Sequence, residues 1–405
     1  MFYNLIGGVM ERIIFHIDVN NAFLSWTAVK LLQEGYKIDI RTIPSVIGGD
    51  EEKRHGIVLA KSPVAKKFGV VTAETLYQAR KKCPNLKTFP ADREFYHLMS
   101  SKLFEYISTY SPDVEKFSID ECFVDMSGMH YLYDDLIGLA YKIKDEIYEK
   151  FGFTVNVGIG NNKLCAKMAS DFEKPNKVHT LFMNEIESKM WPLPIEDLLF
   201  VGKKTSEKLR NLGFNTIGDV AKCDINILNK EFKNMGIEIW NRANGIDDSK
   251  VVSTISESKS ISVSWTLDHD SDEIDFIKEI LLKQVDEVGR SLRRKKLYCR
   301  VVAVTIKTYD FISMSKQCSL DYSINSNDDI YDNVIKLLYK VWNFEKIRNI
   351  GVRLSSFTHD RILQNDLFDN NISSIDKEKV QNAIDKIKDK YGSSIINPAS
   401  LLQKK

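Results

Sequence analysis

The chain has 405 residues, of which 43% are hydrophobic and 28% are charged. This length is more than one hydrophobic core normally holds, so roughly two to four domains are expected. The 57 basic and 56 acidic residues give a net charge of only +1. That balance excludes a strong global field toward polyanions, and any such attraction must come from a local patch.

The six cysteines are scattered along the chain without CxxC spacing, which argues against a zinc site and against a disulfide framework. No apolar run is long enough to cross a membrane. The segment from Met1 to Met10 lacks the basic region and the long apolar core of a secretory signal. We therefore expect a cytoplasmic protein with reduced cysteines.

The first predicted element is a buried strand that begins at Ile13 and ends in Asp18. Turn-forming residues follow it, so the Asp18 carboxylate is expected at the tip of a strand. Between 22 and 91 the pattern predicts short strands at 41–46 and 56–60. A helix is expected after Ser62 and Pro63, a favourable cap and first-turn pair.

A helix with an amphipathic pattern is predicted at 94–110, and an acidic hairpin follows it at 117–125. Asp120 and Glu121 lie between its two apolar arms. Successive side chains of a strand point to opposite faces, so these two carboxylates can share one target only at a turn or bulge. A solvated turn is the competing explanation for such a pair.

Asp18, Asp120 and Glu121 converge if the first strand lies beside the hairpin. Carboxylates this close are costly to bury unless a cation neutralises them. Mg²⁺ is bound by one or two carboxylates together with phosphate oxygens. Three acids at one sheet edge therefore favour phosphoryl transfer with two metal ions.

The next predicted elements are a helix at 136–150, a strand at 154–159 and a helix from about 163. With the earlier strands they favour a ferredoxin-like sheet, with helices on one side and the acids on the other. Lys174 lies just before Pro175, where that last helix is expected to end. Its charge suits a bound phosphate or, alternatively, the helix dipole.

Three motifs now resemble the signatures of Y-family translesion DNA polymerases of the DinB/UmuC type: Asp18–Phe23 (DVNNAF), Ser118–Glu121 (SIDE) and Lys174–Asn176 (KPN). The resemblance covers nearly the whole chain in the family's order. It implies an α+β, right-hand-like polymerase with a palm (11–21 and 92–182), fingers (22–91), a helical thumb (183–252), a βαββαβ little finger (257–360) and a C-terminal tail (361–405).

The resemblance assigns catalysis and metal binding to Asp18, Asp120 and Glu121, and adds Val19 to the metal-binding set. Two Mg²⁺ ions, or Mn²⁺ as a substitute, would activate the primer 3′-hydroxyl and stabilise the transferred phosphate. Phe23 matches the steric gate that excludes a ribose 2′-hydroxyl, although the residue type alone predicts a core aromatic.

The incoming triphosphate is assigned two kinds of partner, backbone amides and side chains. Backbone amides of Asn20, Asn21, Ala22 and Phe23 can cradle it as a turn nest, and Ser62, Lys66 and Lys174 are the expected side-chain partners. The DinB branch usually has a tyrosine at Pro63 and an arginine at Lys66. This departure puts a forked phosphate contact in doubt, because lysine is a point charge, and a solvated helix face competes for Lys66.

The segment 200–209 resembles a helix-hairpin-helix in the thumb, a motif whose loop amides hold a DNA phosphate at a helix start. Gly202, Lys203 and Thr205 are the predicted DNA contacts. Phe200 stands where the motif has its first glycine. Two interpretations of this loop therefore remain: it binds a DNA phosphate, or it keeps the structure of the motif without binding phosphate.

In the predicted little finger, residues 258–267 alternate small polar and apolar side chains, which indicates a half-exposed strand. A helix is expected at 273–295, strands at 299–309 and 311–322, a helix at 328–343 and a last strand at 350–357. The end of the first helix carries Arg293, Arg294 and Lys295, which are predicted to contact DNA phosphates. A solvated helix end explains the same charges.

The tail contains Gln364, Leu367 and Phe368 in a pentapeptide that resembles the sliding-clamp motif of bacterial polymerases. An amphipathic helix follows it, with Val380, Ile387 and Tyr391 on one face.

The resulting hypothesis is a monomeric, template-directed translesion DNA polymerase without proofreading and of low fidelity. Its predicted partners are primer-template DNA, deoxynucleoside triphosphates and a sliding clamp reached through the tail, with no membrane. Two alternatives remain: a nucleotide cyclase, which also places two metals on a ferredoxin-like palm, and a non-catalytic DNA-binding protein in which the acids are incidental.

Overall fold

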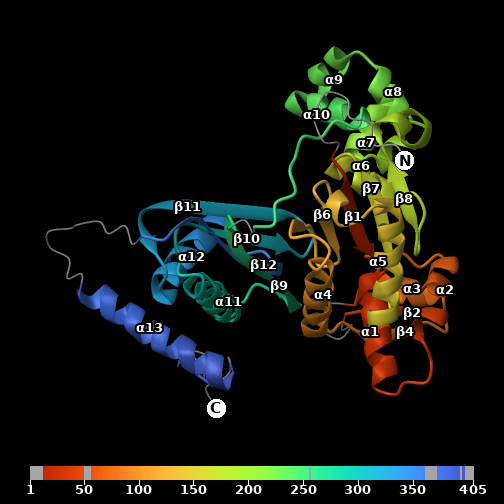
Figure 1. The fold of residues 1–405 in the computed structure, drawn as a ribbon. Helices are drawn as coiled ribbons and strands as arrows, with labels where there is room; N and C mark the ends of the chain where they lie inside the picture. The colour runs from red at the N-terminus through yellow and green to blue at the C-terminus, as the bar shows by residue number, and fades with distance from the viewer. Residues whose placement is uncertain (1–11, 50–55, 255–256, 361–371, 393–394, 397–405) are drawn as a thin grey trace. The chain divides into compact units, whose positions relative to one another are not determined.

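The computed structural model describes residues 12–49, 56–254, 257–360, 372–392 and 395–396. The chain divides into two compact units on either side of residues 255 and 256. Each unit has its own sheets and its own apolar core, and Figure 1 shows the elements of both. Among the described helices, none is long and apolar enough to span a lipid bilayer.

The first unit is built on a five-stranded sheet with the order β5-β6-β1-β7-β8. The strands are β1 (Ile14–Val19), β5 (Val114–Lys116), β6 (Glu121–Asp125), β7 (Val155–Gly160) and β8 (Val178–Leu181). β1 lies in the centre and pairs antiparallel with both β6 and β7. The central place of β1 explains its burial on both faces and its continuous apolar pattern.

Helices cover both faces of this sheet. One face packs on α4 (Arg93–Ile107) and α5 (Leu136–Phe151), with Phe15, Ile17 and Val19 of β1 in the shared core. The other face carries His16 and Asp18, and α6 (Lys163–Asp171) lies against it. The expectation that all helices lie opposite the acids is therefore wrong for α6.

Glycines of β7 let α6 approach closely. A Cβ atom at Gly158 would lie 2.0 Å from the Ala166 carbonyl oxygen, and one at Gly160 would lie 2.6 Å from the Cys165 Cβ. No side chain fits there without moving the helix. The predicted strand-to-helix turn after β7 is thus confirmed, and its glycines set the distance between α6 and the sheet.

Polar side chains start most of these helices at the predicted places. Asp92, Asp135 and Asn162 each accept a hydrogen bond from a backbone amide in the first turn of α4, α5 and α6. Such caps satisfy amides that have no partner inside the helix. They fix where α6 begins and hence which of its residues face the acids.

A three-stranded sheet with the order β3-β2-β4 follows α1 (Ala22–Gln33) in the first unit. It contains β2 (Ser45–Gly48), β3 (Val58–Lys61) and β4 (Lys87–Pro90), with α2 (Pro63–Lys67) and α3 (Leu76–Lys82) packed beside it. The predicted strand at 41–46 is partly wrong: Ile40–Thr42 is a 3-10 helix, which the Asp39 side chain caps, and the strand starts at Ser45.

Short helices complete the first unit. They are α7 (Lys203–Asn211), α8 (Ile217–Lys222), α9 (Ile225–Phe232) and α10 (Asn234–Ala243). Shorter turns precede them at Met183–Glu185, Ile186–Met190 and Ile195–Asp197, and another lies at Met129–Tyr131. The core of these helices is continuous with α6 through Leu164 and Met168.

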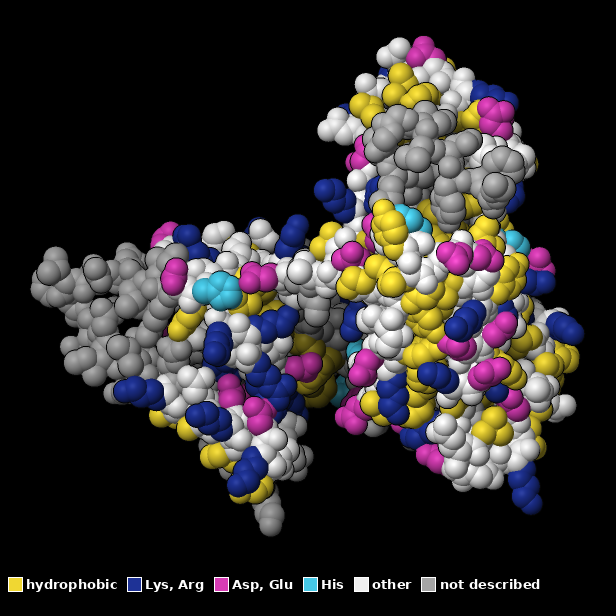
Figure 2. Space-filling view, viewed as in Figure 1, with side chains coloured by type: hydrophobic (Ala, Val, Ile, Leu, Met, Phe, Trp, Pro, Cys, Tyr) yellow, Lys and Arg dark blue, Asp and Glu magenta, His cyan; other side chains and the backbone are white. Residues whose placement is uncertain are grey.

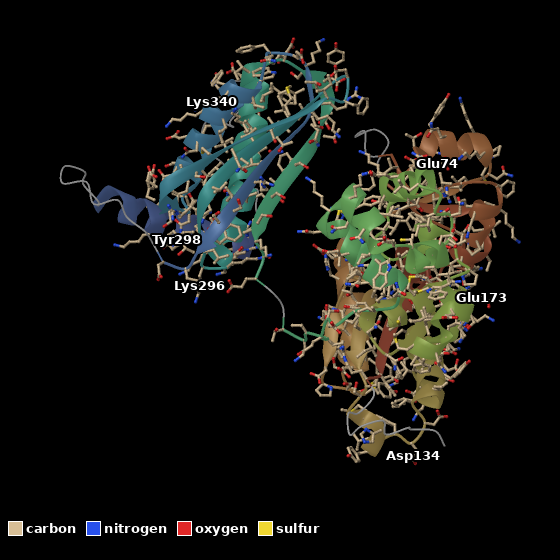
Figure 3. All side chains as sticks on the ribbon, turned by 90° about the horizontal axis from the view of Figure 1, so that it is seen from above. Glu74, Asp134, Glu173, Lys296, Tyr298 and Lys340 are labelled. Carbon is tan, nitrogen blue, oxygen red and sulfur yellow. The ribbon has the colours of Figure 1, made fainter. Side chains whose placement is uncertain are left out.

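The second unit is a four-stranded antiparallel sheet with the order β11-β10-β12-β9. Its elements are β9 (Ser260–Ser271), α11 (Ile274–Arg294), β10 (Tyr298–Thr308), β11 (Ser313–Ile324), α12 (Asn327–Val341) and β12 (Ile347–Thr358). This order confirms the predicted βαββαβ pattern. Lys296 and Tyr298, labelled in Figure 3, lie where α11 passes into β10.

The two faces of this sheet differ. The apolar face packs on α11 and α12, whereas Ser260, Ser262 and Ser264 of β9 are exposed. The view in Figure 2 shows lysine and arginine side chains interspersed with acids on the second unit. The predicted alternation of β9 is confirmed.

The last helix, α13 (Ile372–Tyr391), packs on α11 through charged side chains. Asp385 and Lys388 are buried there, whereas Val380, Ile387 and Tyr391 are exposed. The predicted helix is confirmed, but its apolar face is not the face that packs on α11. Charged residues take that place because the end of α11 presents arginines.

Candidate active site

Three acidic side chains meet at the end of the central strands. Asp18 on β1 and Glu121 on β6 are direct partners in the antiparallel register. Asp120 precedes Glu121 in the turn, and its backbone carbonyl accepts a hydrogen bond from the amide of Val19. Residues more than one hundred positions apart are thus brought to one sheet edge.

Two lysines form ion pairs with Asp18 and Glu121. The Lys167 Nζ lies 2.6 Å from the Glu121 Oε2 and 3.3 Å from the Asp18 Oδ2. The Lys174 Nζ lies 2.6 Å from the same Asp18 oxygen and 2.8 Å from the Asp171 Oδ1. Lys167 comes from the middle of α6 and was not predicted.

The pKa values of Glu121 and Asp120 are shifted in opposite directions. Burial alone would raise the pKa of Glu121, but the close approach of the His16 ring and a hydrogen bond from Lys167 lower it to about 2. The pKa of Asp120 is raised by burial and by the neighbouring charges of Asp18 and Glu121. Burial would lower the pKa of Lys167, yet the surrounding carboxylates raise it to about 12.

His16 lies behind Glu121, fully buried on β1. Its Nε2 is 3.0 Å from the Glu121 Oε2, although the ring is not turned for a well-aligned hydrogen bond, and its Nδ1 is 2.8 Å from the Ser170 hydroxyl. Burial lowers the pKa of His16, which favours the neutral ring. The sequence did not predict the contact of His16 with Glu121, because His16 lies inside an apolar run and resembles a core residue.

The donor set fits a hard divalent cation. One ammonium group already contacts both an Asp18 and a Glu121 oxygen, so a cation is accommodated between the two carboxylates. The described residues do not contain a ready-made cluster of three or more possible ligands. Mg²⁺ does not need one, because substrate phosphates and water complete its shell.

The predicted phosphate cradle is only partly available. The amide of Asn20 already donates to the Thr154 carbonyl. α1 begins at Ala22, and its N-cap residue Asn21 has a left-handed backbone (φ 52°). The first amides of a helix have no partner inside the helix, and the Asn21 side chain does not cap those of α1. A cradle would therefore use the amides from Asn21 to Phe23.

Ser62, predicted to bind nucleotide, is fully buried and serves the fold. Its hydroxyl accepts hydrogen bonds from the amides of Ala65 and Ser45 and donates to the Ile43 carbonyl. This bonding leaves the hydroxyl little capacity for a phosphate. Lys66 is exposed one turn further on.

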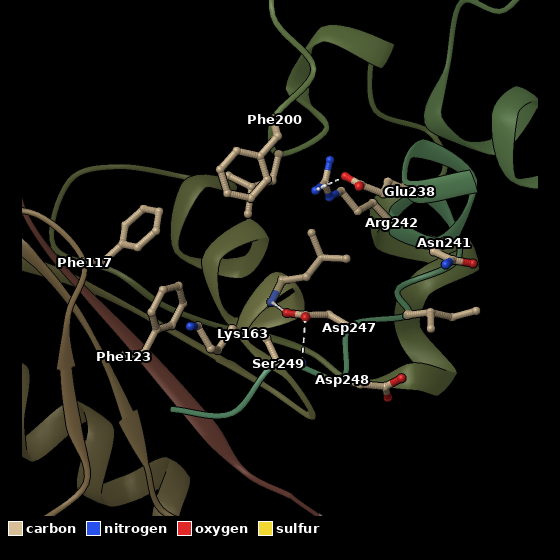
Figure 4. A pocket seen from close by; sticks show the side chains of 13 residues that line it. Phe117, Phe123, Lys163, Phe200, Glu238, Asn241, Arg242, Asp247, Asp248 and Ser249 are labelled. Atoms are coloured by element: carbon tan, nitrogen blue, oxygen red, sulfur yellow. Dashed lines mark hydrogen bonds and ion pairs between the residues drawn. The ribbon is translucent and has the colours of Figure 1, made fainter. Parts of the chain in front are cut away.

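A cavity of about 390 Å³ adjoins the acidic hairpin (Figure 4). Phe117 and Phe123 line it from the hairpin, and Phe200 lines it from the loop before α7. Phe200 has a φ of 68°, a conformation that favours glycine, and its ring lies 4.8 Å from the Arg242 guanidinium. None of the three acids lines this cavity.

The helix-hairpin-helix loop has an open helix start. Gly202 is the N-cap of α7 and provides no side-chain cap, while Lys203 is exposed beside it. The Thr205 amide bonds to the Gly202 carbonyl. The uncapped amides leave room for an anion at this helix start.

The predicted DNA contacts of α11 have different surroundings. Arg293 is buried and forms a two-pronged pair with Asp385 of α13, at 2.6 and 3.0 Å. Arg294 is exposed and pairs with Asp389, and Lys295 bonds to the Ser258 hydroxyl. Arg293 is therefore not free for a phosphate while α13 is in place. The clamp-like residues Gln364, Leu367 and Phe368 lie outside the described residues.

Sequence models of one family match three regions of the chain. The impB/mucB/samB family matches residues 17–171, its C-terminal domain matches 258–367, and the IMS family HHH motif matches 184–214. The first region spans Asp18, Asp120 and Glu121, and the last spans the loop of Phe200.

Relatives named DNA polymerase IV match over almost their full length. The protein from Clostridium acetobutylicum is 44% identical and covers 98% of this chain and 99% of its own length. That from Acetivibrio thermocellus is 34% identical, with 97% and 98% covered. DNA polymerase IV 2 of Bacillus subtilis is 33% identical, with 96% and 95% covered.

A solved Y-family DNA polymerase chimera has a similar fold, with a TM-score of 0.75 at 22% identity, covering 86% of this chain and all of the chimera. This likeness and the matched HHH motif confirm the predicted polymerase fold class. The chain belongs to the impB/mucB/samB family, the Y-family DNA polymerases of the DinB/UmuC type.

Proposed function

We propose that Asp18, Asp120 and Glu121 hold the metal ions with which this translesion DNA polymerase adds deoxynucleotides to a primer 3′-hydroxyl. Metal dependence and low fidelity are general properties of its family. The observation that supports the site is the register pair of Asp18 and Glu121, whose oxygens share one cationic group.

Mg²⁺, or Mn²⁺ as a substitute, supplies a Lewis acid for the primer hydroxyl and for the charge on the transferred phosphate. Asp18 on β1 and Glu121 on β6 both contact the Lys167 ammonium group, and a metal ion would be held between the same two carboxylates. Lys174, 38% exposed, lies at the open side of Asp18 and is the residue placed to meet a triphosphate. Lys66 is the second candidate for that role.

Phe23 is proposed as the steric gate. Its ring is half-buried on α1 and stacks on Tyr96, with centroids 4.8 Å apart. A ring held in this way cannot move aside cheaply for a 2′-hydroxyl. The same residues would then select deoxynucleotides over ribonucleotides.

Primer-template DNA is the macromolecular substrate that this activity requires. The uncapped start of α7 at Gly202 is a candidate phosphate contact, together with Lys203. The exposed serines of β9 offer a second surface without bulky side chains. A sliding clamp reached through Gln364, Leu367 and Phe368, a monomeric state and a cytoplasmic location remain proposals that rest on the sequence.

Primer extension on a damaged template with Mg²⁺ tests the assignment. Wild-type protein should lengthen the primer, and Asp120→Ala should lower the rate by about a thousand-fold or more, because a metal ligand is lost. Asp113→Ala is the matched control, since Asp113 is an exposed acid just before the same hairpin. A failure of wild-type extension, or equal extension by Asp120→Ala, would overturn the proposal. Cyclic nucleotide formation would favour the cyclase alternative.

A further inference from the structure

Asn156 is an unusual residue for its position. It lies in β7, where all six residues are buried, and its own side chain is fully buried. It is also the direct register partner of Asp18. A buried amide in a strand costs free energy unless each of its polar atoms finds a partner.

The Asn156 side chain uses its full bonding capacity. Its Nδ2 donates to the carbonyls of Ser170, at 2.9 Å, and Glu173, at 2.6 Å. Its Oδ1 accepts from the Asn20 Nδ2 at 3.0 Å and from the Lys177 amide at 3.2 Å. An amide offers two donors and two acceptor positions, so no capacity is left over.

The partners of Asn156 enclose the segment that carries Lys174. Ser170 and Glu173 precede it, Lys177 follows it, and the intervening Asn176 amide donates to the Asn20 Oδ1 at 2.9 Å. Glu173 is labelled in Figure 3. Asn156 and Asn20 therefore hold this segment on both sides of Lys174 and tie it to the end of β1.

We propose that Asn156, acting with Asn20, is a positioning residue that holds Lys174 over Asp18 for binding of the incoming triphosphate. The proposal rests on the proposed function and adds a residue that contacts neither substrate nor metal. A fully bonded buried polar network fixes one arrangement of the segments it joins. Lys174 would otherwise sit on a loop with a range of positions.

The first test compares Asn156→Ser with wild-type protein in single-nucleotide insertion. Serine keeps a small polar group but cannot make four bonds, so the segment should loosen without loss of the fold. We expect the KM for the deoxynucleotide to rise about ten-fold, with kcat changed less than about three-fold.

Asn162→Ser is the matched control. Asn162 is also buried, and its side chain accepts from the Cys165 amide and donates to the Gly245 carbonyl, but it does not contact the Lys174 segment. Serine can still cap α6 but loses the bond to the Gly245 carbonyl, so this change should lower the thermal unfolding midpoint and leave the KM for nucleotide unchanged. A similar rise in KM in both variants would indicate general loosening and overturn the proposal.

The decisive measurement is a double-mutant cycle with Lys174→Ala. If Asn156 acts through Lys174, Asn156→Ser should change the KM by less than about two-fold in a chain that already lacks the lysine. The inference is overturned if Asn156→Ser raises the KM equally in the wild-type and the Lys174→Ala chains, or if it does not raise the KM in the wild-type chain. The proposed function stands in either case as long as the wild-type protein is active. Inactive wild-type protein would instead remove the proposed function.

Discussion

The ring of Phe23 lies stacked on the ring of Tyr96, with centroids 4.8 Å apart and planes 15° from parallel. The Thr27 hydroxyl connects them from behind: it is 2.7 Å from the Tyr96 hydroxyl and donates to the Phe23 carbonyl. The position of the ring is thus fixed by packing and by hydrogen bonds.

Phe23→Ala should admit ribonucleotides. Removal of the ring opens space beside the sugar, so discrimination against ribonucleotides should fall by about a hundred-fold or more, measured as the ratio of kcat/KM values for the two sugars. Tyr96→Phe removes the hydroxyl and keeps the stack, and should preserve most of the discrimination. Unchanged sugar selectivity in Phe23→Ala would remove the gate assignment.

Lys167→Met should make the stability of the protein depend on Mg²⁺. Without the ammonium, Glu121 and Asp18 lose a neutralising partner, so the thermal midpoint without metal should fall. Added Mg²⁺ should restore it at a roughly ten-fold lower concentration than wild type needs for its own shift. Lys163→Met is the control, because Lys163 lies on the same helix and pairs with Glu115 instead. Identical Mg²⁺ titrations of the two variants would contradict the shared-cation geometry.

Glu146→Gln should show a stability cost that depends on pH. Hydrogen bonds from Tyr106 and Tyr110 lower the pKa of Glu146. Because the pKa of Glu146 is lower in the folded protein, the ionised carboxylate stabilises the fold. This contribution is complete at pH values above the ordinary pKa of 4.5, and it is lost as the pH falls through the lower pKa of the folded state. The midpoint difference between wild type and variant should therefore be largest near pH 7 and shrink below pH 4.5. Glu149→Gln, a change at an exposed glutamate of the same helix, is the control.

Phe200→Gly should stabilise the loop before α7 slightly. The left-handed backbone costs a bulky residue about 1–2 kcal/mol, while the lost contact with Arg242 is worth about 0.5–1 kcal/mol. A phosphate would also reach the loop amides more easily. We expect equal or higher thermal stability and tighter primer-template binding with a steeper salt dependence. Weaker binding would show that the ring itself contacts DNA.

Arg293→Ala should destabilise the second unit by about 3–5 kcal/mol, because it leaves a buried Asp385 without its partner. Arg294→Ala should cost less than about 1 kcal/mol, since that pair is exposed. The same two variants test the DNA assignments. A flatter salt dependence of DNA binding in Arg294→Ala alone would assign the phosphate contact to that residue.

The convergence of the three acids was predictable because strand geometry limits where side chains can point. An apolar run that ends in Asp18 and a hairpin tip with Asp120 both place carboxylates at strand ends. Neighbouring strands then bring those ends together. The pattern of β9 was predictable for the same reason, since alternation with period two is a local property.

The supporting residues were not predictable in this way. His16 and Asn156 lie inside buried strands and resemble core positions, and Lys167 lies on a helix whose approach is set by Gly158 and Gly160 of β7. Their partners are distant in the chain, as His16 and Glu121 show. The buried pair of Arg293 with Asp385 likewise depends on how α13 packs, which its apolar pattern did not indicate.

The pairing of Lys167 and Lys174 with the acids has a consequence for how DNA reaches the protein. Duplex DNA is a polyanion, and uncompensated carboxylates at the sheet edge would repel its backbone. With two ammonium groups within 3.3 Å of Asp18 and one of them at Glu121, the chain itself reduces that repulsion. We therefore expect the electrostatic cost of bringing a primer end to this sheet edge to be lower than three uncompensated carboxylates would impose.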